Sequence, residues 1–515
     1  MAAPELNLHN IQGNVLAGFN KDHQCFLFVS FPAGSDPKGW LKAICGEVAS
    51  CAEVAAFNAL FKAINERRGA ELGTVEATWM NLALSATGLQ ALGVSASDLE
   101  AFPASFRAGM AAQAPTLGDV GANAPENWIK PLGSLEVHAL VLLAADESAD
   151  LDEAVLRHVD RLAEHDLRLL FKQDGRARSD LPGHEHFGFK DGVSQPGIRG
   201  ITPPNPANPI QGQPGQDLLW PGEFVLGYPT QMGPATPAPL PPGPPGYGSG
   251  ETPPPISEAQ VSNDPGPPAT GGPAWTVDGS FLVFRRLRQD VAGFDEFVAA
   301  SAGSEGVSGG LIGAKLVGRY KSGCPLEHTP DEPPALDPQV ADPSIGDPSL
   351  LSDAKVNDFA YGTDPDGAIV PRAAHVRKVN PRDEPTPGGG APDTLRHRLL
   401  RRGVAYGAPF DQGAPSGSPQ AGDARFPHDR GLLFLCYQSS LERQFEFVQR
   451  LWVNNPNFPR PGDGQDPIIA QLAQPRSFSV PGLAQPELSI PQFVATTGGE
   501  YFFAPSISAI ERLGE

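Results

Sequence analysis

The chain has 515 residues, including 56 prolines and 58 glycines, and carries a formal net charge of -21. Such an acidic surface excludes nucleic acid as a partner and disfavours an anionic membrane, because like charges repel. The length predicts two or more domains. The five cysteines form no CxxC pair, which predicts that the fold has no disulfide framework.

The first ten residues contain neither the charged segment nor the apolar segment of a signal peptide. No apolar run approaches the ~18 residues that would cross a bilayer. We therefore expect a soluble, cytoplasmic protein, although a mature secreted form that starts with a new Met would look the same.

The first part of the chain alternates strands with helices. Short apolar runs predict strands over residues 25–31, 74–84, 138–145 and 168–172. Apolar residues at helical spacing predict helices over residues 40–63 and 151–163.

The composition changes between residues 202 and 273. Residues 235–246 are nearly all proline, glycine and small side chains, which predicts an extended loop and not packed core. Within this region, residues 223–228 could still form an ordered element. A second loop-rich region covers residues 325–371.

The last part returns to the alternating pattern, with strands predicted over residues 280–287, 431–437 and 500–504, and helices over 291–300 and 441–452. This repetition predicts an α+β fold of two ferredoxin-like domains with long Pro/Gly-rich loop insertions. We assign residues 1–200 to the N-terminal domain, 201–275 to the insertion and 276–515 to the C-terminal domain.

The segment Gly188-Phe189-Lys190-Asp191-Gly192 places one carboxylate on a turn framed by glycines. Aspartate in a turn is common. However, glycine at both ends lets a backbone approach a flat ligand closely. Asp191 is therefore a candidate for chemistry at such a ligand.

A single histidine, His375, follows two alanines that leave room beside its ring. If this segment is extended, Arg377 projects to the same face. Haem would suit that pair, with iron for the imidazole and a propionate for the guanidinium. Further along, Arg401 and Arg402 lie among apolar residues; in a strand only one of them can face a pocket, and a buried arginine needs an anionic partner.

His184 and His186 offer a different hypothesis. Two histidines at this spacing on an extended segment could bind zinc or copper. A third and a fourth ligand are not evident nearby, so a hydrogen-bonding role is favoured over a metal site.

Several motifs in order give the chain a resemblance to the dye-decolourising peroxidases, a family of haem enzymes. The Pro-rich segment lies outside this resemblance. The motifs are HNIQGNVL (9–16), GHEHFGFKDGVSQPG (183–197), GSFLVFR (279–285), LVGRYKSG (316–323), AAHVRKVNPR (373–382), LLRRGVAYG (399–407), LLFLCYQSSLE (432–442) and GGEYFFAPS (498–506).

The resemblance implies the roles of the central residues. His375 is similar to the proximal ligand of the haem iron, and Asp191 to the distal acid–base residue. Arg401 is similar to the distal arginine that stabilises the charge formed as the O–O bond breaks. Arg377 is similar to the arginine that binds a propionate. The resemblance also implies that the two ferredoxin-like domains are of the dimeric α+β barrel type and that the C-terminal domain binds the haem.

The resemblance extends to the surroundings of the haem. Leu432 and Phe434 are similar to residues that wall the distal pocket, and Glu442 is the expected acceptor for the second nitrogen of His375. Tyr406 and Trp452 are candidate electron relays to bulky substrates, although both could equally be packing residues.

The implied function is that of a haem-dependent peroxidase with one haem b per chain. It would reduce hydrogen peroxide and oxidise dyes, phenols or similar one-electron donors. The alternative is a haem-binding or iron-releasing protein with little turnover. Asp191 and Arg401 favour the peroxidase, because binding alone requires neither residue. The oligomeric state is not indicated by the sequence.

Overall fold

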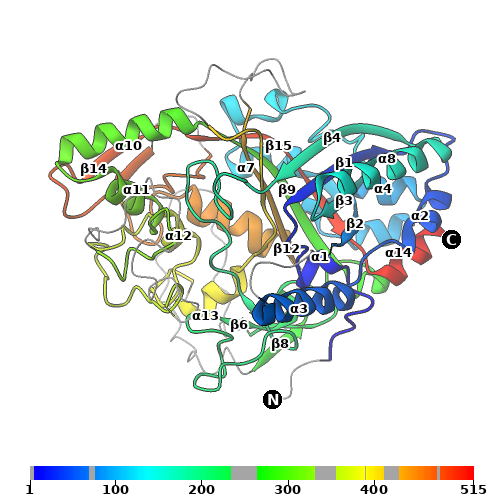
Figure 1. Cartoon of the computed structure of the whole chain (residues 1–515), viewed down its shortest axis with the longest axis horizontal. Coiled ribbons are helices and arrows are strands. Elements are labelled where there is room, and N and C mark those ends of the chain that lie inside the picture. Colours follow the sequence, from blue (N-terminus) through cyan, green and yellow to red (C-terminus); the bar gives the residue numbers. More distant parts are fainter. Residues whose placement is uncertain are drawn as a thin grey trace.

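The computed structural model describes residues 5–68, 76–232, 264–330, 355–388, 390–410, 429–471 and 476–515. Within these residues the core is an antiparallel nine-stranded sheet of order β10-β12-β9-β15-β2-β3-β1-β4, with β11 also paired to β12 (Figure 1). The strands are β1 (His23–Ser30), β2 (Thr78–Leu84), β3 (Ala139–Ala145), β4 (Arg168–Arg176), β9 (Ser280–Gln289), β10 (Leu400–Arg401), β11 (Val404–Tyr406), β12 (Gly431–Gln438) and β15 (Val494–Ala504).

The sheet contains the same strand order twice. The N-terminal half has the order β2-β3-β1-β4 and the C-terminal half the order β10-β12-β9-β15. In both halves the second strand is followed by the third, the first and the fourth, if β10 is taken as the second strand of its half. The halves join where Phe503 of β15 pairs with Leu84 of β2. At the far ends β4 lies against β11, where a Cβ on Gly175 would be only 2.5 Å from Cγ1 of Val404. The sheet therefore closes on itself, and the predicted α+β class with two ferredoxin-like units is confirmed.

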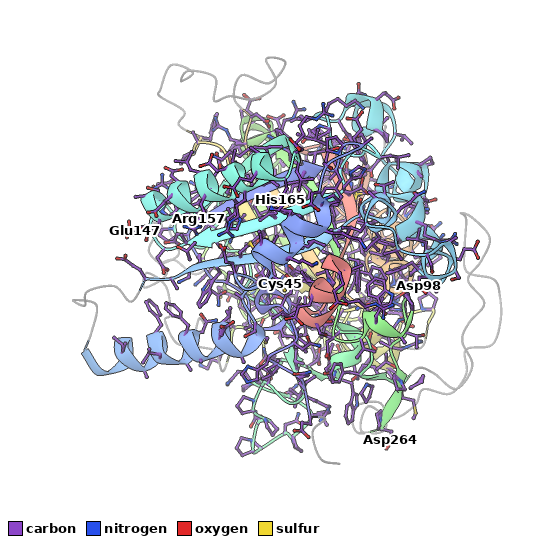
Figure 2. The ribbon with its side chains drawn as sticks, turned by 90° about the vertical axis from the view of Figure 1, so that its right-hand side faces the viewer. Cys45, Asp98, Glu147, Arg157, His165 and Asp264 are labelled. Atoms are coloured by element: carbon purple, nitrogen blue, oxygen red, sulfur yellow. The ribbon has the colours of Figure 1, made fainter. Side chains whose placement is uncertain are left out.

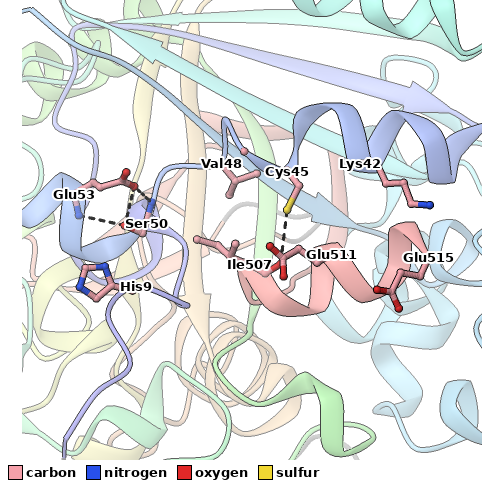
Figure 3. Close-up of a pocket in the computed structure, with 10 residues that line it drawn as sticks. His9, Lys42, Cys45, Val48, Ser50, Glu53, Ile507, Glu511 and Glu515 are labelled. Atoms are coloured by element: carbon pink, nitrogen blue, oxygen red, sulfur yellow. Dashed lines mark hydrogen bonds between the residues drawn. The ribbon is translucent and has the colours of Figure 1, made fainter.

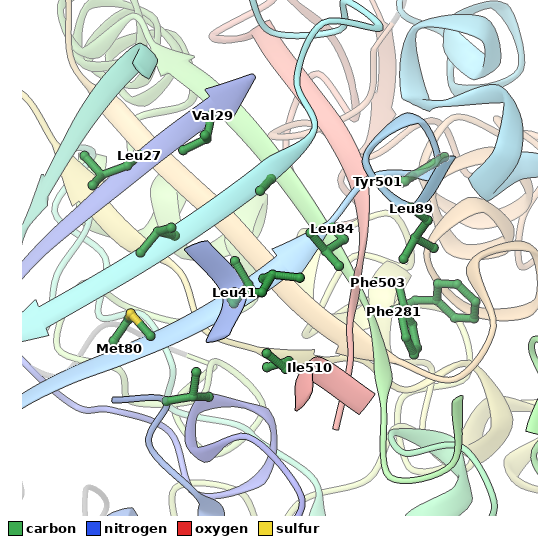
Figure 4. Close-up of a cluster of buried hydrophobic side chains, with 14 of the residues drawn as sticks. Leu27, Val29, Leu41, Met80, Leu84, Leu89, Phe281, Tyr501, Phe503 and Ile510 are labelled. Carbon is green, nitrogen blue, oxygen red and sulfur yellow. The ribbon is translucent and has the colours of Figure 1, made fainter. Parts of the chain in front are cut away.

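Alternating side chains divide the core between the two faces of the sheet. On the inner face, the ring centroid of Phe28 lies 5.1 Å from that of Phe284 and 6.4 Å from that of Phe502, which joins the two halves. On the outer face, Leu27 and Val29 belong to a second apolar cluster that is covered by helices (Figure 4). Apolar burial on both faces explains why the strands appear in the sequence as nearly continuous apolar runs.

Helices cover the outer faces of the two halves, as Figure 1 shows. Figure 2 shows His165 just after α8 (Ser148–Glu164), on the side of the molecule turned to the viewer. Its Nδ1 lies 3.1 Å from Oδ2 of Asp36 at the start of α2 (Pro37–Cys45).

No helix in the described ranges is long and apolar enough to cross a membrane. The helices are α1 (Gly13–Leu16), α2 (Pro37–Cys45), α3 (Cys51–Arg68), α4 (Ala86–Ala91), α5 (Ala96–Glu100), α6 (Ala104–Ala108), α7 (Met110–Leu117), α8 (Ser148–Glu164), α10 (Val291–Glu305), α11 (Gly309–Val317), α12 (His375–Val379), α13 (Ala391–Thr394) and α14 (Ile507–Gly514).

The helix predicted over residues 40–63 is in fact two helices, α2 and α3. The second one begins after a capping box, in which the Ser50 hydroxyl accepts the Glu53 N–H at 3.3 Å and the Glu53 carboxylate accepts the Ser50 N–H at 2.8 Å. Farther along, the helix predicted over 441–452 consists largely of wider π-type turns, Leu441–Phe445 and Val448–Val453.

The described parts of the Pro/Gly-rich region are packed against the barrel. Glu223 is fully buried and accepts hydrogen bonds from the Gln231 N–H at 2.8 Å and from Arg443 at 3.1 Å. An ordered element therefore does exist at residues 223–228. The expected loop over residues 235–246 lies outside the described residues, and the domain boundaries at 200 and 276 stay predictions. The short strands of this and other loops are β5 (Gly197–Ile198), β6 (Leu218–Leu219), β7 (Pro229–Gln231), β8 (Pro265–Pro268), β13 (Arg476–Ser479) and β14 (Glu487–Ile490).

A buried carboxyl group on β15 predicts how stability changes with pH. Burial raises the pKa of Glu500 to about 7. Because the folded chain favours the protonated carboxyl group, Glu500 stabilises the fold fully at pH values below its unfolded pKa. This contribution to the unfolding free energy, on the order of 3 kcal/mol, is lost as the pH rises to about 7. We expect that a rise from pH 4.5 to 7.5 lowers the midpoint of thermal unfolding less in Glu500→Gln than in the wild type. The exposed Glu487→Gln on β14 is the control; an equal pH response in all three proteins would contradict the prediction.

Candidate active site

His375 is the first residue of α12, and its orientation is fixed by a buried carboxylate. The Nδ1 atom lies 2.8 Å from Oδ2 of Asp466, a side chain with no exposed surface. The other oxygen of Asp466 accepts the N–H groups of Ile468 and Ile469 at 2.8 Å each. Burial would raise the pKa of Asp466, but His375 and these two amides hold it below its usual value. Asp466 thus accepts a hydrogen bond from Nδ1, which leaves Nε2 as the ring nitrogen that can bind a metal.

The expectation that Glu442 accepts this hydrogen bond is wrong, since Asp466 occupies that position. Glu442 is exposed on the π-type turn that begins at Leu441. Asp466 is 91 positions from His375 and lies in an irregular loop, so neither spacing nor periodicity pointed to it.

Arg377 is not available for a propionate, which corrects the prediction made from the sequence. Its guanidinium is fully buried, and its five N–H groups match five hydrogen bonds, to the Asp364 and Glu384 carboxylates and to the backbone oxygens of Asp364 and Val370. The prediction assumed an extended segment. In the helix α12, residues two positions apart point in directions about 200° apart, so Arg377 faces away from His375.

Asp191 is presented by a tightly braced loop. The buried carboxylate of Glu185 accepts the N–H groups of Phe187 and Phe189 at 2.8 Å each. Gly188 has a φ of +88° in this turn, a conformation that favours glycine. Oδ1 of Asp191 accepts the next N–H, that of Gly192, at 2.7 Å, and its Oδ2 has no hydrogen-bond partner among the described residues. Asp191 is thus fixed in place with one oxygen free.

Arg401 comes from the edge strand β10 and meets Asp191. Arg401 pairs with Cys436 on β12, so these two side chains lie on the same face of the sheet. Phe434, two residues before Cys436, lies on that face as well. Its Nη2 donates to the Ser194 carbonyl at 2.7 Å, and its Nη1 is 3.6 Å from Oδ1 of Asp191. Both side chains are about one-third exposed, at 32% and 35%.

Arg402 takes the opposite direction, as the strand alternation predicted. Its Nη2 donates to the carbonyl of Leu16 at 2.9 Å and its Nε to that of Asn14 at 2.9 Å, at the end of α1. Of the arginine pair, only Arg401 faces the predicted pocket.

The outer face of β12 is only half covered at Leu432 and Phe434, whereas residues 433 and 435–438 on the same strand are buried. Phe434 packs against an apolar cluster that also contains Phe189, Ala373 and Ile468. These residues precede or follow Asp191, His375 and Asp466 in the chain. The cluster therefore places the three predicted functional segments around one face of the C-terminal sheet.

A group of arginines lies next to the Asp191 loop. The side chain of Asn357 donates to the Val193 carbonyl at 2.9 Å, its Oδ1 accepts from Arg319 at 2.8 Å and its backbone oxygen accepts from Arg382 at 2.9 Å. Burial, followed by repulsion from Arg382, lowers the pKa of Arg319 to about 10.

A third member, Arg398, is buried, and its Nη1 lacks a hydrogen bond even though Asp217 is 3.3 Å away. Burial and the nearby Arg382 and Arg401 lower its pKa. Since buried cations need anionic partners, this group fits the carboxylates of a ligand such as haem. Together with the free Nε2 of His375, the donor set is the one that a haem requires.

Tyr406 and Trp452 are both buried. The Tyr406 hydroxyl donates to Asp429 at 3.1 Å, whereas Trp452 stacks on Phe458 with a centroid distance of 5.1 Å. Their role as electron relays stays a prediction.

His184 and His186 each bind a backbone carbonyl, that of Pro182 and that of Tyr406, both at 2.8 Å. Burial lowers the pKa of His186 to about 4, so this ring is neutral. No group of three or more metal-ligating side chains occurs within the described ranges. Both histidines thus make the hydrogen bonds that the sequence favoured.

An open pocket of about 650 Å³ lies between α2 and α14 (Figure 3). It is lined by none of the predicted site residues. Its thiol, Cys45, is 3.9 Å from the carbonyl of Ile507, and burial together with Glu511 raises its pKa. The pocket therefore offers no activated nucleophile.

Comparison with known proteins gives two family matches along the chain. Residues 10–179 match the DyP dimeric alpha+beta barrel domain, and residues 255–458 match the C-terminal domain of Dyp-type peroxidases. The dye-decolorizing peroxidase AauDyP1 of Auricularia auricula-judae is 32% identical over 534 residues, covering 99% of this chain and 87% of the relative.

Solved structures give the same picture. An ancestral D-type dye decolorizing peroxidase is 30% identical with a TM-score of 0.75, covering 99% of both chains. A dye-decolorizing peroxidase in complex with 2,6-dimethoxyphenol is 28% identical with a TM-score of 0.72, covering 99% of this chain and 100% of the other.

Proposed function

Because the chain belongs to the dye-decolourising peroxidase family and is therefore a haem peroxidase that reduces hydrogen peroxide, we propose that it binds one haem b between His375 and the Asp191–Arg401 pair. When bound, the iron supplies the site that activates peroxide and takes up its oxidising equivalents. The observation that carries the proposal is the buried Asp466, which leaves only Nε2 of His375 to bind a metal.

On the proximal side, the roles follow from the hydrogen-bond pattern. Asp466 holds the proton on Nδ1 of His375 and makes the ring a stronger electron donor through Nε2. Because the carboxylate is also held by two backbone amides, the ring cannot rotate without breaking a buried hydrogen bond.

On the distal side, Asp191 is the proton carrier. Its free Oδ2 accepts the proton from one oxygen of the incoming peroxide and delivers it to the other oxygen, which leaves as water. The guanidinium of Arg401 acts as a fixed positive charge that stabilises the negative charge formed during bond breakage. Its contact with Ser194 holds it in place beside Asp191.

Arg319, Arg382 and Arg398 are the proposed partners of the haem propionates in place of Arg377. This assignment is supported by the contacts of Arg319 and Arg382 with Asn357, which bonds the Asp191 loop, and by the Nη1 of Arg398, whose partner is the Asp217 carboxylate at 3.3 Å without a hydrogen bond. Leu432 and Phe434 then form the apolar wall of the distal side.

Phenols and dyes are the proposed electron donors, in line with the 2,6-dimethoxyphenol complex of the related structure. Tyr406 and Trp452 are kept as candidate relays for donors too bulky to reach a buried haem. Both rings are oxidisable and lie in the C-terminal half, but neither is at the surface.

Reconstitution with iron protoporphyrin IX tests the proposal. We expect a Soret band, a rapid spectral change on mixing with hydrogen peroxide, and oxidation of 2,6-dimethoxyphenol. His375→Ala should lose the stoichiometric Soret band, whereas the exposed His9→Ala should keep it. A His375→Ala protein that binds haem as the wild type does would reject the assigned ligand.

A further inference from the structure

Lys378 lies one turn after His375 on α12 and is completely buried. Its ammonium donates to three backbone carbonyls of one loop, those of Asn455 at 2.9 Å, Phe458 at 2.6 Å and Gly464. An ammonium has three N–H groups, so all of its donors are used. Gly464 is two residues before Asp466, and Lys378 therefore fastens the loop that carries the partner of His375.

A second buried cation holds the same loop from the other side. Nη1 of Arg476 donates to the carbonyl of Asp466 itself at 3.0 Å and to that of Ala470 at 3.2 Å. Asp463, in the same loop, has its own partner, Arg372, at 2.6 Å.

The charges of Lys378 and Arg476 are therefore not neutralised by a carboxylate in direct contact among the described residues. Their donors go to carbonyl groups, and the loop carries two buried carboxylates, Asp463 and Asp466. Burial lowers the pKa of both cations, and attraction to Asp466, for Lys378 also to Asp463, opposes this effect. In a buried setting such through-space interactions are weakly screened.

We propose that Lys378 is a positioning residue for Asp466 and that its charge weakens the hydrogen bond from Nδ1 of His375 to Asp466. A nearby cation stabilises the carboxylate charge, so the carboxylate is a weaker hydrogen-bond acceptor. His375 then donates less electron density through Nε2, which favours reduced iron. This inference rests on the proposed function, because it requires haem iron on His375.

The test is the reduction potential of the haem iron in the holoenzyme, measured by spectroelectrochemistry. Burial lowers the pKa of Lys378 to about 7, so measurements at pH 5 keep it charged. Lys378→Met should shift the oxidised-to-reduced equilibrium about tenfold towards oxidised iron, about 59 mV for one electron. Lys378→Arg, which keeps the charge, should stay close to the wild type.

Lys315 provides a matched control. It is also a buried lysine, and it donates to two backbone carbonyls that lie outside the Asp466 loop, those of Ala368 at 2.8 Å and Ile369 at 2.7 Å. Lys315→Met should shift the equilibrium less than half as much as Lys378→Met. Equal shifts would show a general loss of positive charge and would overturn the inference.

A double-mutant cycle tests whether Lys378 acts through Asp466. In an Asp466→Asn background, Lys378→Met should add little further shift, and the full shift in that background would overturn the proposal. If Lys378→Met does not fold, Lys378→Gln is measured in its place with the same expected direction.

The outcomes also separate this inference from the proposed function. A wild type without a Soret band, or one whose haem is retained by His375→Ala, would overturn both. A wild type that binds haem through His375 and reacts with peroxide, but whose potential is unaffected by loss of the Lys378 charge, would overturn only the role of Lys378.

Discussion

Asp191→Asn should lower the second-order rate constant for the reaction with hydrogen peroxide by roughly 100- to 10,000-fold, the range typical for loss of a general acid–base group. Asparagine has nearly the same shape but cannot carry the proton between the two peroxide oxygens. The rate is measured by stopped-flow mixing of the holoenzyme with increasing peroxide concentrations. Haem content, followed by the Soret band, should be unchanged.

Asp180→Asn is the matched control for this prediction. Asp180 precedes the same loop, is itself exposed and pairs with Arg178 at 2.6 Å. Its loss should change the rate by less than about twofold, since Asp180 lies outside the proposed proton path. If Asp191→Asn retained more than half of the wild-type rate, Asp191 would not be the proton carrier.

Arg377→Met should destabilise the fold far more than it affects haem binding. It leaves the carboxylates of Asp364 and Glu384 buried without their partner, which costs roughly 3–5 kcal/mol of unfolding free energy. We expect a large fall in the midpoint of thermal unfolding for both the apoprotein and the holoprotein. The affinity for haem, measured below this midpoint, should change little.

Arg157→Met, which removes the solvent-exposed partner of Glu47 at 3.8 Å, is the control for Arg377→Met and should cost less than about 1 kcal/mol. The opposite pattern for Arg377→Met, an intact fold with weakened haem binding, would restore the propionate role that the sequence suggested.

The strands were predictable because they are buried on both faces and therefore form apolar runs, as in β3 and β12. Their closure into a barrel was expected only from the resemblance and not from the strand pattern, since it depends on contacts between residues such as Gly175 and Val404, which are far apart in the sequence. The break between α2 and α3 did have a local signal, the capping box of Ser50 and Glu53, which the apolar spacing concealed.

The site shows the same division between local and distant information. Asp191 and Arg401 lie in short motifs, and the structure places Oδ1 of Asp191 3.6 Å from Nη1 of Arg401. Glu442 was chosen as the partner of His375 because it lies in a recognisable segment, whereas the true partner, Asp466, lies in an irregular loop. Arg377 was misjudged because the conformation of its segment was assumed to be extended.

The repeated strand order has a consequence for how the enzyme is assembled. Asp191 follows β4, the last strand of the first repeat, whereas Arg401, His375 and Asp466 all lie in the second repeat. Neither repeat alone contains a complete set of reactive groups. The proposed acid–base residue is thus supplied by the chain that follows the first repeat to a scaffold built by the second, so the proposed activity requires both repeats.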